Sequence, residues 1–251
     1  MCTAAYRVRA GRVTGRGHLL DGSNCQDAHA QLAFEHTGQR YLCGVVTDGC
    51  GSGACSEVGA QLGAHVISRE IRRLVEVGTP VEELAEPLFE RLLSSLRGLL
   101  AACRIEGAGE RTRFVADFLL FTVGGFLVAP RQTLIFAAGD GVVLLNDALH
   151  LREQQNAPAY PGYLLLTGPD ATSVPARFDC YTLPTTELER LAIGSDAWIA
   201  ERTLLEQLGE LRRPASLQLR MNRWSAAQHF QDDATLIVVE RETSLQKGGA
   251  P

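Results

Sequence analysis

Acidic residues stand at the ends of apolar runs or beside turns at five positions along this chain. A single Asp in a turn is common, but acids at the ends of several strands can converge on one edge of a sheet. Carboxylates gathered in this way repel one another and raise one another's pKa values, so such clusters usually hold hard cations. Oxygen ligands without paired His or Cys indicate Mg²⁺ or Mn²⁺ rather than zinc. The five positions are Asp27, Asp48, Asp140, Asp196 and the pair Asp232-Asp233.

The segment around Asp48 carries the most information. Residues 41–46 form a short apolar run with Val and Leu, which predicts a strand buried on both faces. Three glycines follow Asp48, and they permit a tight turn and let a ligand approach the backbone closely. A helical pattern begins at Ala54. The sequence therefore predicts a carboxylate at the end of a rigid strand, beside Gly49, Gly51 and Gly53.

Three interpretations fit this turn. Asp48 would cap the following helix, or contribute to a metal site, or residues 49–54 would bind a dinucleotide, because they fit G-x-G-x-x-A after a strand. A dinucleotide-binding unit needs a parallel second strand after its first helix. Here a second helical pattern follows the first, and Glu70, near the distance expected for the ribose-binding acid, falls inside a helix. Asp48 would also repel a pyrophosphate, so dinucleotide binding is disfavoured.

The composition limits the class of protein. A length of 251 residues favours one large domain, and contents of 45% apolar and 21% charged residues are typical of a soluble globular protein. The net charge of −5, without any run of Lys or Arg, argues against a nucleic-acid partner. The longest apolar stretches contain glycines and are too short to span a bilayer, so we expect no membrane interaction.

The cysteines indicate a reducing compartment. The chain has seven, an odd number, with no C-x-x-C pair, and its first residues lack the apolar core of a signal peptide. We therefore expect reduced thiols and a cytoplasmic protein. Cys50 and Cys55 flank the glycine turn, where a zinc pair is conceivable. No second pair with zinc-ligand spacing occurs, so small buried or turn residues are the preferred interpretation.

Hydrophobic periodicity predicts an order of strands and helix pairs. One domain is expected over residues 1–241, with a loop over 15–27. A flap-like insertion is expected around 154–182, where the chain is rich in Pro, Tyr and Gly, and a disordered tail over 242–251. Strands are predicted over 6–13, 28–34, 41–47, 114–128, 133–138, 142–145, 189–195 and 231–240, and helices over 54–77, around 84–99, and over 198–211 and 215–229.

The acidic motifs together resemble a known family, the metal-dependent Ser/Thr protein phosphatases of type 2C. They occur in the family's order, span nearly the whole chain, and are most similar to the compact bacterial branch, in which Gly-x-x-His-Leu precedes Cys-Gln-Asp. The matching motifs are Asn24-Cys-Gln-Asp27-Ala, Val45-Val-Thr-Asp48-Gly-Cys-Gly-Ser-Gly53, Ala138-Gly-Asp-Gly141, Ile193-Gly-Ser-Asp196 and Asp232-Asp-Ala-Thr-Leu-Ile-Val-Val239.

The resemblance implies an α+β fold, a four-layer α-β-β-α sandwich with two central, mainly antiparallel sheets and a two-metal centre at one end. By motif position, Asp48 would bridge two Mn²⁺ or Mg²⁺ ions and Gly49 would offer its carbonyl to one of them. Asp196 and Asp232 would ligate the other ion, and Asp27 would hold a metal-bound water. Family members place an acid for a weaker third metal where this chain has Asp117.

The implied activity is hydrolysis of phosphoserine and phosphothreonine on proteins by a water that bridges the two ions. A bridging water has its pKa lowered enough to attack phosphorus near neutral pH, while the cations spread the charge of the phosphoryl oxygens. No cysteine nucleophile is required. The implied partners are a phosphoprotein substrate and a cognate Ser/Thr kinase.

Two departures from the family pattern leave an alternative open. His18, with Arg16 beside it, stands near the place where larger relatives carry a phosphate-gripping Arg; otherwise His18 is a loop residue without a role. Ala197 follows Asp196 where the family usually has Gly, and it would cost about 1 kcal/mol if that position required a positive φ. The alternative is a catalytically weak phosphatase-fold module that binds phosphoproteins in regulation. The filled acidic positions favour the enzyme.

Overall fold

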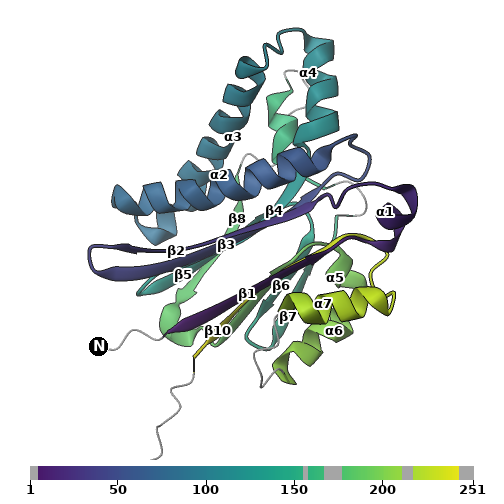
Figure 1. The fold of residues 1–251 in the computed structure, drawn as a ribbon. Coiled ribbons are helices and arrows are strands. Elements are labelled where there is room, and N and C mark those ends of the chain that lie inside the picture. Colours follow the sequence, from purple (N-terminus) through teal and green to yellow (C-terminus); the bar gives the residue numbers. More distant parts are fainter. Residues whose placement is uncertain (1–4, 155–157, 167–176, 211–216, 243–251) are drawn as a thin grey trace, which may run out of the picture.

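The computed structural model describes residues 5–154, 158–166, 177–210 and 217–242. Strands of these residues form two five-stranded antiparallel sheets (Figure 1). The first sheet has the order β1 (Tyr6–Val13), β10 (Ala234–Arg241), β9 (Arg190–Gly194), β6 (Gly141–Leu145) and β7 (Ala148–Arg152). The second has the order β2 (Asp27–His36), β3 (Gln39–Gly49), β4 (Phe121–Val128), β5 (Gln132–Ala138) and β8 (Asp179–Pro184).

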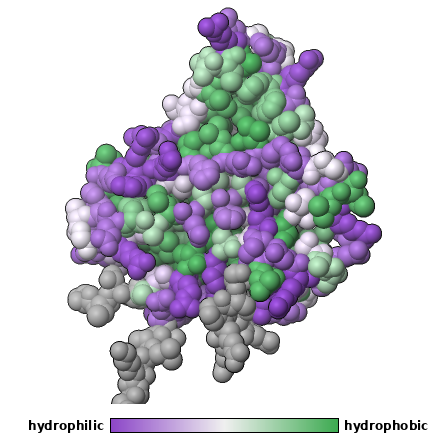
Figure 2. Space-filling model, in the orientation of Figure 1, coloured by the Kyte–Doolittle hydropathy of each residue, from purple (hydrophilic) through white to green (hydrophobic). Residues whose placement is uncertain are grey.

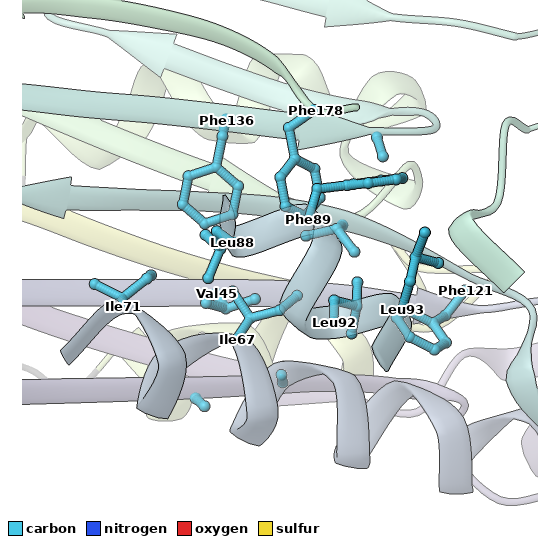
Figure 3. Close-up of a cluster of buried hydrophobic side chains, with 14 of the residues drawn as sticks. Val45, Ile67, Ile71, Leu88, Phe89, Leu92, Leu93, Phe121, Phe136 and Phe178 are labelled. Carbon is cyan, nitrogen blue, oxygen red and sulfur yellow. The ribbon is translucent and has the colours of Figure 1, made fainter. Parts of the chain in front are cut away.

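Two long helices, α2 (Ser56–Glu76) and α3 (Ala85–Ala102), cover the outer face of the second sheet. Apolar side chains recur at helical spacing on both, because one face of each helix is removed from water. Figure 3 shows Ile67 and Ile71 of α2 beside Leu88 and Leu92 of α3, below the ring of Phe136 on β5. The helices predicted over 54–77 and around 84–99 are confirmed.

Three shorter helices, α5 (Ala197–Ala200), α6 (Arg202–Glu206) and α7 (Leu217–Ala226), pack on the first sheet. Trp198 is fully buried at the centre of this layer, with its ring edge-on to those of Trp224 and Phe230. Its indole N–H donates to the carbonyl of Thr235 at 3.0 Å. This contact fixes the start of α5, just after Asp196, against β10.

The inner faces of the two sheets pack on each other through a third apolar cluster, which includes Ile193, Ile237, Phe126 and Ile135. A Cβ added at Gly124 of β4 would lie 2.7 Å from Cγ2 of Ile193, so glycine is needed there for the sheets to approach. Helices, two sheets and helices thus form four layers. The predicted α+β class and four-layer α-β-β-α sandwich are confirmed.

Two segments fold differently from the prediction. The loop predicted over 15–27 contains a helix, α1 (Arg16–Asp21), which buries none of its residues and so leaves no amphipathic pattern in the sequence. The strand predicted over 114–128 begins only with β4 at Phe121, because the helix α4 (Ala108–Phe114) and a π-helical turn (Val115–Leu119) precede it. Val115 and Leu119 are both buried at helical spacing, and this apolar run was not separable from the strand that follows.

The insertion expected around 154–182 stays a prediction over much of its length, because residues 155–157 and 167–176 lie outside the described residues, as does the tail 243–251. Its last residues belong to β8, which pairs with β5. β8 is an edge strand with mostly exposed residues, so no apolar run marks it. No helix of the described chain is long and apolar enough to cross a membrane. The remaining short helices are η1 (Val81–Glu83), η3 (Pro161–Leu165), η5 (Thr185–Glu187) and η6 (Gln207–Glu210).

Candidate metal centre and reaction site

The second sheet places two of the acids opposite each other. Asp27 is the first residue of β2 and Asp48 is next to last in β3, and the register of these antiparallel strands pairs them directly. Thr122 of β4 lies on the other side of Asp48. Antiparallel pairing brings the start of one strand beside the end of the next, so acids 21 positions apart in sequence meet at one sheet edge.

The first sheet supplies acids from the end of β9 and the start of β10. Asp196 follows β9 and precedes α5, and Asp232 lies just before β10, which pairs with β9. Asp140 lies at the tip of the β5–β6 turn, between Gly139 (φ 88°) and Gly141 (φ 137°). These positive φ values require glycine, so the Gly-Asp-Gly sequence is a direct consequence of the turn.

These strand ends surround a cavity of about 70 Å³. This volume is far below the roughly 300–1,000 Å³ of pockets that enclose a whole small-molecule ligand. It is suited to ions and water rather than to a dinucleotide. Its lining includes Asp48, Gly49, Asp140, Asp196, Asp232 and Asp233.

The electrostatics of the cavity oppose ionisation of several carboxylates at once. Burial, and then the charges of Asp27, Asp196 and Asp232, hold the pKa of Asp48 well above its usual range. Burial is also the first cause that raises the pKa of Asp196, and it raises that of Asp140 to about 6, with Asp196 contributing. A cation in the cavity would remove this repulsion, because an opposite charge favours the ionised form.

Asp27 is fully buried, and its carboxylate is held on one side only. The hydroxyl of Ser195 donates to Oδ2 of Asp27 at 2.7 Å, and the backbone N–H of Thr235 donates to the same hydroxyl at 3.0 Å. Burial raises the pKa of Asp27, and the Ser195 hydrogen bond opposes that rise. Oδ1 of Asp27 is buried without a hydrogen-bond partner. Such an orphaned oxygen beside other carboxylates fits a site completed by a metal ion or an ordered water.

Asp233, which the sequence left without a role, ties the loop before β2 to the site. Its carboxylate accepts the backbone N–H groups of Gly15 at 2.7 Å and Gln26 at 2.5 Å, so it binds both ends of the loop that contains α1. A Cβ at Gly15 would lie 2.2 Å from the carbonyl carbon of Asp232, so only glycine permits this approach.

His18 lies on α1, within the loop whose two ends bind Asp233. Its Nδ1 is 2.8 Å from Oδ2 of Asp233, and ligand atoms of His18, Asp232 and Asp233 lie within 4.8 Å of one another. These three side chains are close enough to hold a metal ion together. His18 is not itself among the described residues that line the acidic cavity, but it contacts Asp233, a buried acid that is.

Asp117 is placed differently from the other predicted ligands. It lies in the π-helical turn, and its backbone carbonyl accepts the N–H of Cys55 at 2.9 Å. Among the described residues that line the acidic cavity, Asp117 does not occur. Its role as a ligand of a third metal stays a prediction.

Residues next to the predicted ligands were noted in the sequence as departures from the expected pattern or as possible zinc ligands. Ala197 is the first residue of α5 and does not have a positive φ, so the missing glycine causes no strain.

Cys50 and Cys55 do not belong to any group of metal-ligating side chains within the described chain. Burial opposes ionisation of the Cys50 thiol, but hydrogen bonds from Ser52 and other neighbours outweigh it and lower the pKa.

Two sheets that bring five acids to one cavity, between two helical layers, define the architecture of a metal-dependent phosphatase. A family model for protein phosphatase 2C matches residues 14–196. This match covers well over half of the 251 residues. The chain belongs to the protein phosphatase 2C family, which confirms the resemblance seen in the motifs.

Solved structures of bacterial phosphatases share the fold. Stp1 from Staphylococcus aureus matches with a TM-score of 0.62 at 14% identity, over 95% of this chain and 96% of that one. The catalytic domain of PstP, in complex with two manganese ions, matches with 0.55 at 14% over 94% and 97%. PppA, a regulatory component of T6SS in Pseudomonas aeruginosa, matches with 0.52 at 18% over 96% and 99%. No curated protein sequence matches significantly.

Proposed function

We propose that this protein is a metal-dependent protein-serine/threonine phosphatase that hydrolyses phosphoserine and phosphothreonine on proteins. The observation that carries the proposal is the acidic cavity, where Asp48, Asp196 and Asp232 approach from both sheets. Its donors are oxygen atoms, as Mn²⁺ and Mg²⁺ prefer. The raised pKa values of Asp48 and Asp196 indicate charge that a divalent cation would balance.

We assign the metal ligands as the motif positions suggest. Asp48 and the carbonyl of Gly49, with Asp196 and Asp232, would hold two Mn²⁺ or Mg²⁺ ions, and Asp117 would hold a weaker third ion. The two manganese ions of PstP, a protein with the same fold, support this number. When bound, such cations lower the pKa of water and neutralise charge on the phosphoryl oxygens.

The chain's own groups would orient water and substrate. Asp27 offers its partnerless Oδ1 as an acceptor for the attacking water, while Ser195 keeps the carboxylate from rotating. His18 contacts Asp233 of the cavity lining, and we assign it to binding of the phosphoryl group. Glycine is needed at position 49, because a Cβ there would lie 2.7 Å from Oγ of Ser56.

The substrate class and the cell compartment follow by analogy with the family. We expect a phosphoprotein as substrate and a Ser/Thr kinase as the opposing enzyme. Free cysteines at the described positions agree with a reducing cytoplasm.

The test is turnover of p-nitrophenyl phosphate and of a phosphothreonine peptide by purified protein. Hydrolysis of both should require Mn²⁺ or Mg²⁺ and stop on addition of a chelator. If the protein binds the phosphopeptide but turns over neither substrate with any of these metals, the regulatory binding module is the better description.

A further inference from the structure

A groove of about 450 Å³ lies between the edges of the two sheets. Its floor is formed by apolar side chains of β5 and β6, among them Ile135, Val143 and Leu145, which extend the cluster between the sheets. The volume is within the roughly 300–1,000 Å³ of ligand-binding pockets. Partial exposure of apolar residues does not by itself indicate a ligand, so the argument for an occupant depends on where the groove lies.

The groove begins close to the acidic cavity, because one hairpin contributes to both. Asp140 at the tip of the β5–β6 hairpin lines the cavity, whereas Ile135 and Val143 on its two strands line the groove. A strand rises about 3.3 Å per residue, so Val143 and Ile135 lie roughly 10 and 17 Å from Asp140 along the hairpin. An extended peptide has nearly the same rise. Residues about three to five positions from a phosphorylated residue in the cavity would therefore reach the groove.

An ion pair marks the end of the groove nearest the cavity. Arg152 of β7 lies opposite Gly141, and Asp179 of β8 lies opposite Ala137, so the pair joins the two sheets beside the Asp140 turn. Nη2 of Arg152 is 2.7 Å from Oδ2 of Asp179, and Nε of Arg152 donates to the carbonyl of Gly139 at 3.1 Å. The two opposite charges balance each other, so this pair gives the groove no excess charge with which to select an ionic side chain.

Two edge strands border the groove, and this favours an extended occupant. β7 and β8 are the terminal strands of their sheets among the described strands. Tyr181 of β8 is paired with Ile135, lines the groove and is 57% exposed. An edge strand has backbone groups without a strand partner, and extended peptides bind such edges while their alternate side chains fill neighbouring pockets.

Resting on the proposed phosphatase function, we propose that the groove docks an extended segment of the phosphoprotein substrate. Apolar side chains about three to five positions from the phosphorylated Ser or Thr pack on Ile135, Val143 and Leu145 while the phosphoryl group reaches the acidic cavity. The groove thus adds affinity for protein substrates that have apolar residues at this distance. It takes no part in breaking the phosphorus–oxygen bond.

Two phosphothreonine peptides of equal length test the proposal. One has Leu at the third and fifth positions on both sides of the phosphothreonine, and the other has Ser at these positions. With saturating Mn²⁺ the wild type should have a KM at least about 10-fold lower for the Leu peptide, because burial of Leu side chains is favourable. The two kcat values should agree within about twofold, since this binding is the same in the ground state and the transition state.

A pair of variants on the two edge strands locates the effect. Tyr181→Ser should raise KM for the Leu peptide by about fivefold or more and leave KM for the Ser peptide near wild type. Leu151 of β7 gives the matched control, because it is 37% exposed but does not line the groove. Successive residues of a strand point to opposite faces, so Leu151 faces away from the side that bears Arg152. Leu151→Ser should leave both KM values near wild type.

Equal KM values for the two peptides in the wild type, or equal losses on both in Tyr181→Ser, would overturn the docking site. Light scattering gives one further outcome: a wild-type dimer that Tyr181→Ser dissociates would show that a second copy covers the groove, and this would also overturn the proposal. If the wild type fails to hydrolyse p-nitrophenyl phosphate with Mn²⁺ or Mg²⁺, the phosphatase assignment is wrong, and substrate docking is wrong with it. Turnover of p-nitrophenyl phosphate with equal KM values for the two peptides rejects the docking site alone.

Discussion

Two hollows lined by described residues differ in character, and the proposed reaction site is the smaller one. The acidic cavity of about 70 Å³ lies where strand ends from both sheets converge. A groove of about 450 Å³ lies between the edges of the sheets, lined mainly by apolar residues of β5 and β6 and by Tyr181 of β8. An ion pair between Arg152 and Asp179 is part of its wall. Volume alone would select the groove, but its lining does not bring several acids together.

The difference follows from what each set of residues needs. Ile135, Val143 and Leu145 at the groove continue the apolar cluster between the sheets, and their partial exposure requires no ligand. The acids of the cavity are brought together against their mutual repulsion, which costs stability unless something balances it. Leu19 and Leu20 of α1 are 64% and 75% exposed, and Figure 2 shows apolar surface where α1 lies in Figure 1; neither residue lines the acidic cavity. A reaction site is recognised here by that unbalanced charge rather than by volume.

The largest expected effect, and the strongest test of the difference between the cavity and the groove, comes from removing the proposed ligands in the cavity. Asp48→Asn and Asp232→Asn should each lower kcat by at least about 100-fold, because each loses a charge that holds a cation at the developing transition state. The melting temperature without metal should stay level or rise, since repulsion is relieved. Steady-state kinetics with Mn²⁺ and thermal melts with a chelator measure both. Near wild-type rates in both variants would place the metal centre elsewhere.

The second-largest effect should be on the pH dependence of the melting temperature, which the acids of the cavity should change. Asp140 has its pKa raised to about 6 in the folded protein, above the usual value near 3.9 expected in the unfolded chain. The folded state therefore binds more protons between these values, and this contribution to stability is lost as pH rises through about 6. Asp140→Asn mimics the neutral form. Without metal it should melt at a higher temperature than the wild type at pH 7.5.

The control for this prediction is the same comparison at low pH. At pH 4, where Asp140 is protonated in the folded wild type, the gap in melting temperature should close. A gap of constant size across the range would mean that repulsion in the cavity does not limit stability.

The thiol beside the ligands gives a smaller effect. Cys50 has a lowered pKa and lies one residue after Gly49, so a thiolate nucleophile is the alternative to water. Cys50→Ser and Cys55→Ser should keep turnover within about threefold, because water is the proposed nucleophile. Loss of activity in a folded Cys50→Ser protein would instead support a thiol or zinc mechanism.

The groove should give the smallest effect of all. Tyr181 is 57% exposed at its rim, so Tyr181→Ser removes apolar surface without exposing the core. Turnover of p-nitrophenyl phosphate should stay within about twofold, as is usual for surface changes away from the chemistry. A large loss of turnover in this variant would show that the groove takes part in the reaction, contrary to the separation described above.

The sequence predicted those parts of the site whose signal is local. The strand ending at Asp48, the glycine turn and the two long helices each have a period or a turn residue of their own. The motifs also placed Asp27, Asp196 and Asp232 at strand ends, and the sheets bring them together.

The missed parts depend on contacts between distant segments. His18 and Asp233 are 215 positions apart, and Ser195 and Asp27 are 168 apart, so neither hydrogen bond has a pattern in the sequence. α1 and β8 were missed because an exposed short helix and an exposed edge strand carry little apolar periodicity. Two sequence features could have indicated these contacts: the second acid of Asp232-Asp233, and Ser195 directly before Asp196.

The central claim is that the acidic cavity, and not the larger groove, holds the divalent cations. Crystals grown with Mn²⁺ and measured near the manganese absorption edge test it most directly. We predict two anomalous peaks in the cavity, within ligand distance of Asp48, Asp196 and Asp232, and none in the groove. A cavity without manganese at millimolar Mn²⁺, or peaks only at other positions, would contradict this account.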